Sequence, residues 1–90
     1  DSDVGNHVIV NTKASIDHDC KIENYVHLAP GSTLCGGVKV GEGTLIGAGA
    51  VVLPNVSIGK WCTIAAGSVV HQSVADNQTW IGKSLKLNIK

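Results

Sequence analysis

The segment Ser15-Ile16-Asp17-His18-Asp19-Cys20 places one imidazole between two carboxylates, in a stretch of chain otherwise rich in Val, Ile, Ala and Gly. A histidine can act as a general base near neutral pH when a carboxylate fixes its tautomer and stabilises its cation. Asp17 or Asp19 can supply that carboxylate. The segment therefore predicts proton-transfer chemistry at His18, and the elements around it must leave room for a substrate.

Length and charge exclude several classes of protein. Ninety residues make at most one small domain, and seven basic against seven acidic residues give no electrostatic case for nucleic acid or a membrane surface. The chain shows no apolar run long enough to span a membrane and no secretory leader, and its first residue, Asp1, suggests a fragment. Three cysteines without CxxC spacing argue against disulfides and structural zinc, and predict a cytoplasmic protein.

A period of six residues organises the chain. Branched aliphatic residues occupy twelve positions six apart: Val4, Val10, Ile16, Ile22, Leu28, Leu34, Val40, Ile46, Val52, Ile58, Ile64 and Val70. The residues four positions further on, such as Val8, Ala14 and Cys20, are all small or β-branched. This period fits neither an α-helix nor a long alternating strand, and it predicts short strands joined by corners.

Glycine marks the corners. Five glycines lie three residues after an aliphatic position, where a left-handed backbone conformation is inexpensive for Gly: Gly31, Gly37, Gly43, Gly49 and Gly67. The pattern resembles the hexapeptide repeat of left-handed parallel β-helices over residues 4–75. The resemblance implies an all-β fold with three hexapeptides per triangular coil. We expect about four coils in a β-helix domain over residues 1–75, and a C-terminal extension over 76–90 with a final strand in residues 84–90.

Residues eighteen apart then stack on the same face of the prism. One outward column holds His18, Gly36, Pro54 and Gln72, the second holds Thr12, Pro30, Ala48 and Ala66, and the polar third column holds Asn6, Asn24, Glu42 and Lys60. Gly36 lies one rung, about 5 Å, from His18. A glycine there leaves room beside the imidazole and exposes a backbone N–H that can stabilise an oxyanion.

The stretch IDHDCKIENYVHLAPGSTLCGGVKVGEGTLIGAGAVVLPNVSIG resembles the β-helical half of bacterial sugar acetyltransferases, of the sialic-acid O-acetyltransferase and UDP-4-amino-sugar N-acetyltransferase type. The resemblance matches His18 to the general base and Asp19 to the acid that orients it. It matches Gly36 to the amide that binds the thioester carbonyl, and His27 to a second histidine that lines the substrate cleft.

The same resemblance implies the partners. Acetyl-CoA is the co-substrate, no metal is needed, and small residues matching Ala48 and Ala66 let the pantetheine arm run along the coils. The acceptor is an amino or hydroxyl group of a sugar or nucleotide-sugar, which attacks acetyl-CoA directly. Family members are homotrimers with the cleft between subunits. This chain lacks the family's α/β half and has Gly82-Lys83-Ser84-Leu85-Lys86 where a proline-containing ending is usual.

Two alternatives from other classes stay open. A zinc carbonic anhydrase on the same fold has two histidines five residues apart, whereas the histidines here are at positions 7, 18, 27 and 71. A non-catalytic trimeric β-helix that serves as a scaffold is the other. Cys35 lies next to Gly36, but no neighbour in the sequence would activate it as a nucleophile.

Overall fold

The computed structural model describes residues 2–86, with side chains described as far as Lys83, and its elements are strands and turns. Twelve two-residue strands and two longer ones follow one another: β1 (Asp3–Val4), β2 (Ile9–Val10), β3 (Ser15–Ile16), β4 (Lys21–Ile22), β5 (His27–Leu28), β6 (Thr33–Leu34), β7 (Lys39–Val40), β8 (Leu45–Ile46), β9 (Val51–Val52), β10 (Ser57–Ile58), β11 (Thr63–Ile64), β12 (Val69–Val70), β13 (Thr79–Ile81) and β14 (Ser84–Lys86). The expected all-β fold class is confirmed.

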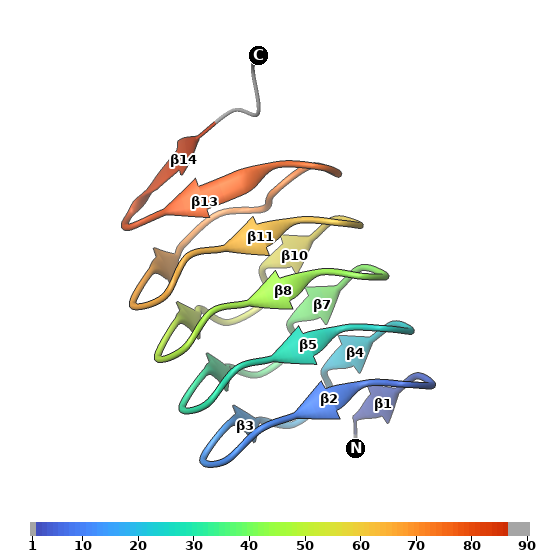
Figure 1. Ribbon diagram of the computed structural model, residues 1–90. Coiled ribbons are helices and arrows are strands. Elements are labelled where there is room, and N and C mark those ends of the chain that lie inside the picture. The colour runs from blue at the N-terminus through green and yellow to red at the C-terminus, as the bar shows by residue number, and fades with distance from the viewer. Residues whose placement is uncertain (1, 87–90) are drawn as a thin grey trace.

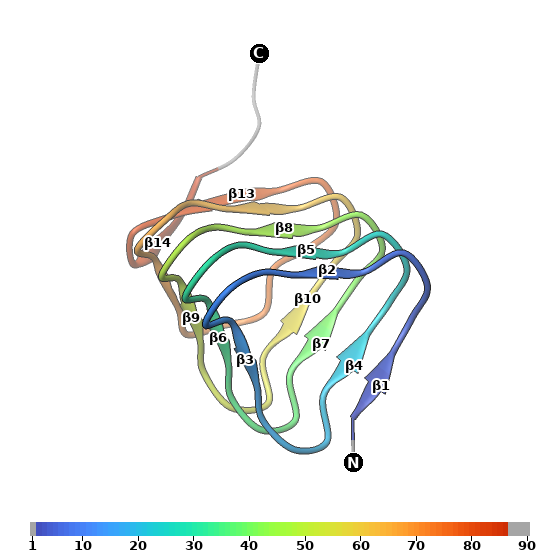
Figure 2. The same cartoon turned by 60° about the horizontal axis from the view of Figure 1, so that its bottom comes forward.

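The strands form three sheets, parallel except for β14, around a triangular solenoid of about four coils (Figure 2). Sheet A holds β1, β4, β7 and β10, sheet B holds β2, β5, β8, β11, β13 and β14, and sheet C holds β3, β6, β9 and β12. Residues eighteen apart pair between coils, as in Asp3 with Lys21 and His27 with Leu45. The strands β2, β5, β8, β11 and β13 of sheet B run from right to left at the front of the molecule while the chain climbs (Figure 1), which is the left-handed sense. The predicted left-handed β-helix and its stacking register are therefore both confirmed.

The core is a narrow column of aliphatic side chains. From Cys20 to Val74 the predicted inward positions are buried, and the largest exposed fraction among the buried apolar side chains is 5%, at Val56. Val4 and Val10 occupy inward positions in the first coil but are 45% and 48% exposed, because within residues 2–86 no coil lies on their N-terminal side. Each covered aliphatic side chain contributes roughly 1.5–3 kcal/mol through burial.

The corners adopt the predicted left-handed conformation, with φ between 69° and 73° at the five corner glycines. Seven non-glycine residues in the described part of the chain also have positive φ, and Asp19 is one of them at 59°. Asp tolerates this conformation better than most residues because its short side chain can hydrogen-bond locally. The corner fixes the backbone of Asp19, and this directs its carboxylate toward the preceding residue, His18.

Trp80 closes the C-terminal end of the prism. β13 pairs in parallel with β11, and β14 pairs antiparallel with β13. The Trp80 side chain is fully buried, and its indole N–H donates to the carbonyls of Val69 and Gly82 at 3.1 and 2.9 Å. The expected final strand begins with β14, and residues 87–90 of the tail lie outside the described residues. The domain division at residue 75 stays a prediction.

Replacing Trp80 with Ala should lower the free energy of unfolding by about 3–5 kcal/mol, because it opens the end of the core. Urea unfolding measures this loss. Trp61→Ala is the control, since the Trp61 side chain is 57% exposed, and it should cost less than half as much. Equal losses from the two variants would show that Trp80 does not act as a cap.

Candidate active site

His18 and Gly36 lie in adjacent coils at the edge where sheet C meets sheet A. The Gly37 N–H donates to the His18 carbonyl at 3.0 Å, which sets one coil directly over the other. A Cβ added to Gly36 would stand 2.9 Å from His18 Cε1 and 3.1 Å from Nε2. The imidazole therefore lies against the bare Cα of Gly36, and any side chain at that position would displace it.

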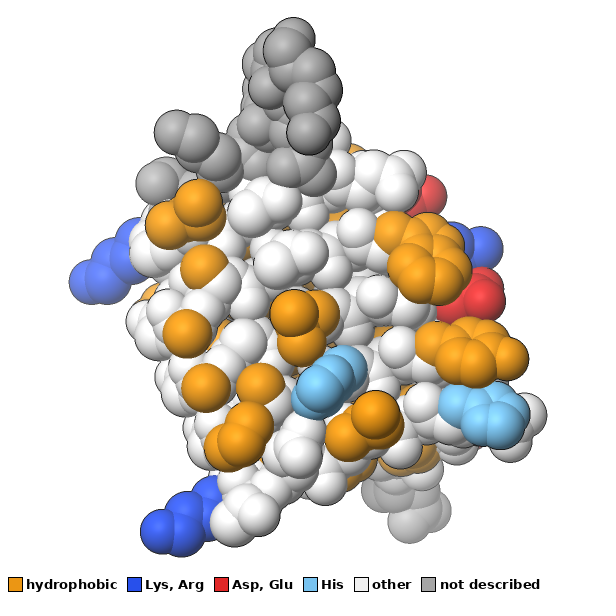
Figure 3. All heavy atoms as spheres, in the orientation of Figure 1, with side chains coloured by type: hydrophobic (Ala, Val, Ile, Leu, Met, Phe, Trp, Pro, Cys, Tyr) orange, Lys and Arg blue, Asp and Glu red, His pale blue; other side chains and the backbone are white. Residues whose placement is uncertain are grey.

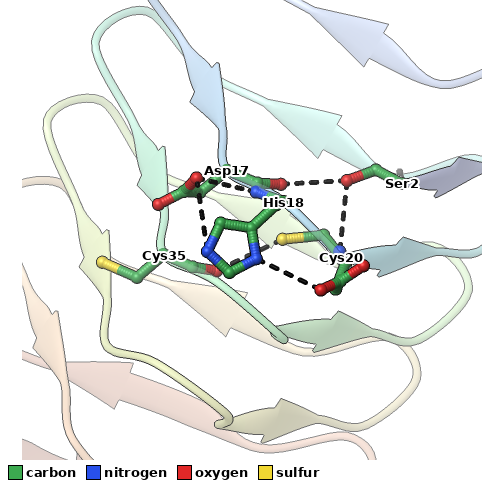
Figure 4. Close-up of polar contacts among 6 residues, drawn as sticks. Ser2, Asp17, His18, Cys20 and Cys35 are labelled. Carbon is green, nitrogen blue, oxygen red and sulfur yellow. Dashed lines mark hydrogen bonds and ion pairs between the residues drawn. The ribbon is translucent and has the colours of Figure 1, made fainter.

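Two carboxylates flank the imidazole in different ways (Figure 4). His18 Nδ1 lies 3.2 Å from Asp19 Oδ2, whereas Nε2 lies 4.0 Å from Asp17 Oδ1. Asp17 Oδ1 instead accepts the backbone N–H of His18 at 2.7 Å. A proton on Nδ1, donated to Asp19, leaves the Nε2 lone pair free to act as a base. The structure thus favours Asp19 in a choice that the sequence left open.

The contact with His18 also affects Asp19. The hydrogen bond from His18 lowers the pKa of the Asp19 carboxyl below its ordinary value of 3.8. Asp19 is therefore ionised at neutral pH, as a group that stabilises an imidazolium must be. The His18 and Asp19 side chains are 70% and 71% exposed in the single chain, so solvent reaches both.

A groove of about 420 Å³ opens beside the imidazole, and its walls are Asp17, His18, Asp19, Cys35, Gly36, Gly37, Pro54 and Asn55. Within residues 2–86 the Gly36 N–H donates to no protein acceptor. The equivalent N–H groups of Asn6 and Lys60 donate to Asn24 Oδ1 and Asp76 Oδ1 in the next coil, both at 2.8 Å. In the coil above Gly36 the corresponding residue is Pro54, whose side chain has no hydrogen-bond acceptor. The Gly36 N–H therefore remains available to a ligand in the groove.

The other predicted site residues lie on different sides of the prism. His27 is on β5 in sheet B, and Ala48 and Ala66 are at the edge between sheets B and C. One chain therefore brings together His18, Asp19 and Gly36, but it does not bring His27, Ala48 or Ala66 to the same groove.

The sequence analysis missed Asn11, which contacts His27. Asn11 Nδ2 donates to His27 Nε2 at 2.7 Å and to the Leu28 carbonyl at 3.2 Å. A proton on Nδ1 of His27 then faces away from this contact. Asn11 follows an aliphatic position, a place that varies widely among the repeats, and so the sequence carried no signal for this contact.

The described residues meet the requirements neither of a metal site nor of a membrane-spanning helix. Among residues 2–86, no three His, Cys, Asp or Glu side chains come together in a way that could hold a metal ion. The same part of the chain contains no helix with the length and apolarity needed to cross a bilayer.

The fold and the repeat define the class of protein. Residues 37–72 match the family model described as bacterial transferase hexapeptide (six repeats). The chain belongs to the hexapeptide-repeat family of left-handed β-helices, as the sequence pattern predicted. No curated protein matches the chain.

Several solved structures are similar to the chain. A perosamine N-acetyltransferase variant from Caulobacter crescentus, in complex with CoA and GDP-perosamine, is 40% identical over 99% of this chain and 42% of its own, with a TM-score of 0.93. The acetyltransferase domain of PglB from Neisseria gonorrhoeae, in complex with acetyl coenzyme A, is 35% identical over 96% of this chain and 45% of its own, with a TM-score of 0.86. WeeI from Acinetobacter baumannii is 29% identical over 97% of this chain and 43% of its own, with a TM-score of 0.91. The chain thus spans less than half the length of these proteins.

Gly36→Ala should displace the His18 ring and break its contact with Asp19, because the added methyl group overlaps the imidazole. The change to stability should stay within about 1 kcal/mol, since Gly36 does not have a positive φ. Imidazole NMR signals of His18 report the displacement.

Gly49→Ala is the control for this prediction. Its φ of 69° makes the substitution strained, yet nothing lies within 4 Å of the added Cβ. It should cost stability and leave the His18 signals unchanged. Unchanged His18 signals in Gly36→Ala would contradict the packing described above.

Proposed function

We propose that this protein takes part in acetyl-CoA-dependent transfer of an acetyl group to an amino or hydroxyl group of a sugar or nucleotide-sugar. One observation carries the proposal: His18 and Gly36, whose N–H has no protein acceptor within residues 2–86, lie against each other and line the same 420 Å³ groove. A base and an oxyanion donor side by side are what acyl transfer requires. The similar structures hold CoA, acetyl coenzyme A or GDP-perosamine, which supports this choice of substrates.

The reaction follows from the contacts of His18. Its Nδ1–H is held by Asp19, so Nε2 removes a proton from the acceptor as the acceptor nitrogen or oxygen attacks the thioester carbon. The Gly36 N–H stabilises the negative charge that develops on the carbonyl oxygen. The tetrahedral intermediate then collapses, the C–S bond breaks, and the imidazolium returns its proton to the CoA sulfur. Asp19 stabilises the imidazolium between these two steps.

Transfer is direct, without an acyl-enzyme. The Cys20 thiol is 2% exposed and points into the prism, and so it cannot reach a thioester. Cys35 lines the groove, but no hydrogen bond from its thiol to a base is found in the described part of the chain. All three cysteines are free thiols, and on this ground we place the protein in the cytoplasm.

Ala48 and Ala66 suit the pantetheine arm of the coenzyme. They stack one coil apart on the edge between sheets B and C, and their methyl groups leave space for a chain laid along that edge. Within residues 2–86, neither backbone N–H donates to a protein acceptor. These two donors can bind the pantetheine carbonyls.

The complete cleft requires a second copy of the chain. His18 and Gly36 lie on one edge of the prism, whereas His27, Ala48 and Ala66 lie on sheet B or at its junction with sheet C. A homotrimer brings one edge of each copy against sheet B of the next. Sheet B and its border with sheet A carry the exposed apolar side chains Ile9, Tyr25, Leu45, Trp61 and Ile81 (Figure 3), as a subunit interface would.

His18→Ala should lower the rate of acetyl transfer by about 10²- to 10⁴-fold while the trimer remains intact. Release of CoA thiol from acetyl-CoA, with amino-sugar nucleotides as acceptors, measures the rate. Lys39→Ala is the control: Lys39 lies on β7 in sheet A, outside the groove and outside the proposed interface, and its loss should leave the rate unchanged. A His18→Ala enzyme with near-normal turnover would end the proposal.

Mixing two inactive variants tests whether the cleft is shared. His18→Ala and His27→Ala trimers should each be inactive, because each lacks one histidine in every cleft. After the two are unfolded and refolded together, about one quarter of the clefts regain both histidines, and activity should return to that level. A mixture as inactive as its components would contradict a cleft built from two chains.

A further inference from the structure

The thiol of Cys20 makes a contact that the proposed mechanism does not use. Cys20 Sγ donates to the Cys35 carbonyl in the next coil at 3.2 Å, and the thiol is buried beneath the groove (Figure 4). The Cys35 carbonyl and the Gly36 N–H belong to one planar peptide unit. A contact that fixes the carbonyl on the inner side therefore also fixes the direction of the N–H on the outer side.

Six of the twelve corners described between residues 5 and 74 hold the equivalent carbonyl by a local turn. The N–H three residues further on donates to it, as Ala50 does to Gly47 at 3.1 Å and Ser68 to Ala65 at 3.2 Å. The Cys35 carbonyl receives no such bond from Val38 within residues 2–86. The Cys20 thiol is the donor that holds this peptide.

Inward hydroxyl groups replace the local turn in the same way at two other corners. Ser2 Oγ donates to the Asp17 carbonyl at 2.9 Å, and Thr44 Oγ1 donates to the Gly59 carbonyl at 2.7 Å. In each case the acceptor lies fifteen residues after the donor, as Cys35 does after Cys20. The thiol of Cys20 is thus one example of a recurrent device in this chain that ties a corner peptide to the coil below.

We propose that Cys20 is a positioning residue for the reaction: its thiol holds the Cys35–Gly36 peptide so that the Gly36 N–H points into the groove. The inference rests on the proposed function for the role of that N–H. A hydrogen bond to the carbonyl also polarises the peptide unit and makes its N–H a better donor. Cys20 therefore helps Gly36 to stabilise the oxyanion, because its thiol binds the carbonyl on the inner side of the same peptide unit.

Three substitutions at Cys20 separate the hydrogen bond from packing. Cys20→Val fills the position without a donor, as Val38 and Val56 do above it in the same column, and both fit the core there. Cys20→Ser keeps a donor, and Cys20→Ala removes both donor and volume. The control is Cys62→Val: the Cys62 thiol is equally buried and donates to the Ala75 carbonyl at 3.0 Å, away from the groove.

Two measurements on the full chain decide the inference. In Cys20→Val and Cys20→Ala, kcat for acetyl transfer should fall about 3- to 10-fold with KM for acetyl-CoA unchanged, while Cys20→Ser keeps the wild-type kcat. The amide ¹H–¹⁵N NMR signal of Gly36 should move in the same two variants, return in Cys20→Ser, and stay in place in Cys62→Val.

Failure of this inference differs from failure of the proposed function. A wild-type protein without acetyl transfer ends the proposed function, and the Gly36 amide signal still tests whether Cys20 holds the peptide. If the Gly36 signal does not move in Cys20→Val, the inference is overturned. An active wild type whose kcat is matched by Cys20→Val overturns it as well.

Discussion

Parallel backbone hydrogen bonds between coils set residues eighteen apart directly above one another, and the pairing of His18 with Gly36 in the candidate site depends on this stacking. The Gly37 N–H donating to the His18 carbonyl is one rung of it. A slip of one residue between these coils would move Gly36 off the imidazole. The narrow aliphatic core prevents such a slip, because it would turn buried side chains outward. The register between the coils therefore fixes the position of Gly36 relative to the His18 imidazole.

The prism makes chemistry possible on an edge without a deep pocket. His18, Asp17 and Asp19 are largely exposed in the single chain, so water competes for each of their contacts. A neighbouring copy laid over this edge would exclude that water and strengthen both the carboxylate–imidazole contact and the oxyanion contact. In the proposed trimer, subunit assembly and catalysis would be linked in this way, since the same face would supply the second wall and the dry environment.

Most of the scaffold could be predicted from the sequence, because the six-residue period determines which side chains face inward and which residues stack. The neighbourhood of His18 and Gly36 follows directly from counting eighteen residues. Features that depend on side-chain rotamers could not be predicted. The contact of Asn11 with His27, the hydrogen bond of the Cys20 thiol to the Cys35 carbonyl and the shorter distance of His18 Nδ1 to Asp19 than of Nε2 to Asp17 are of this kind. Trp80 also escaped prediction, because it lies where the repeat has ended and the period no longer applies.

The central claim is that the imidazole of His18 and the N–H of Gly36 act on one thioester in a cleft between two chains. A crystal structure of the protein with acetyl-CoA tests it most directly. The account predicts the thioester carbonyl oxygen about 2.7–3.1 Å from Gly36 N, with His18 Nε2 facing the carbonyl carbon and the pantetheine arm along Ala48 and Ala66 of a neighbouring chain. A coenzyme bound elsewhere, or a thioester turned away from both groups, would contradict it.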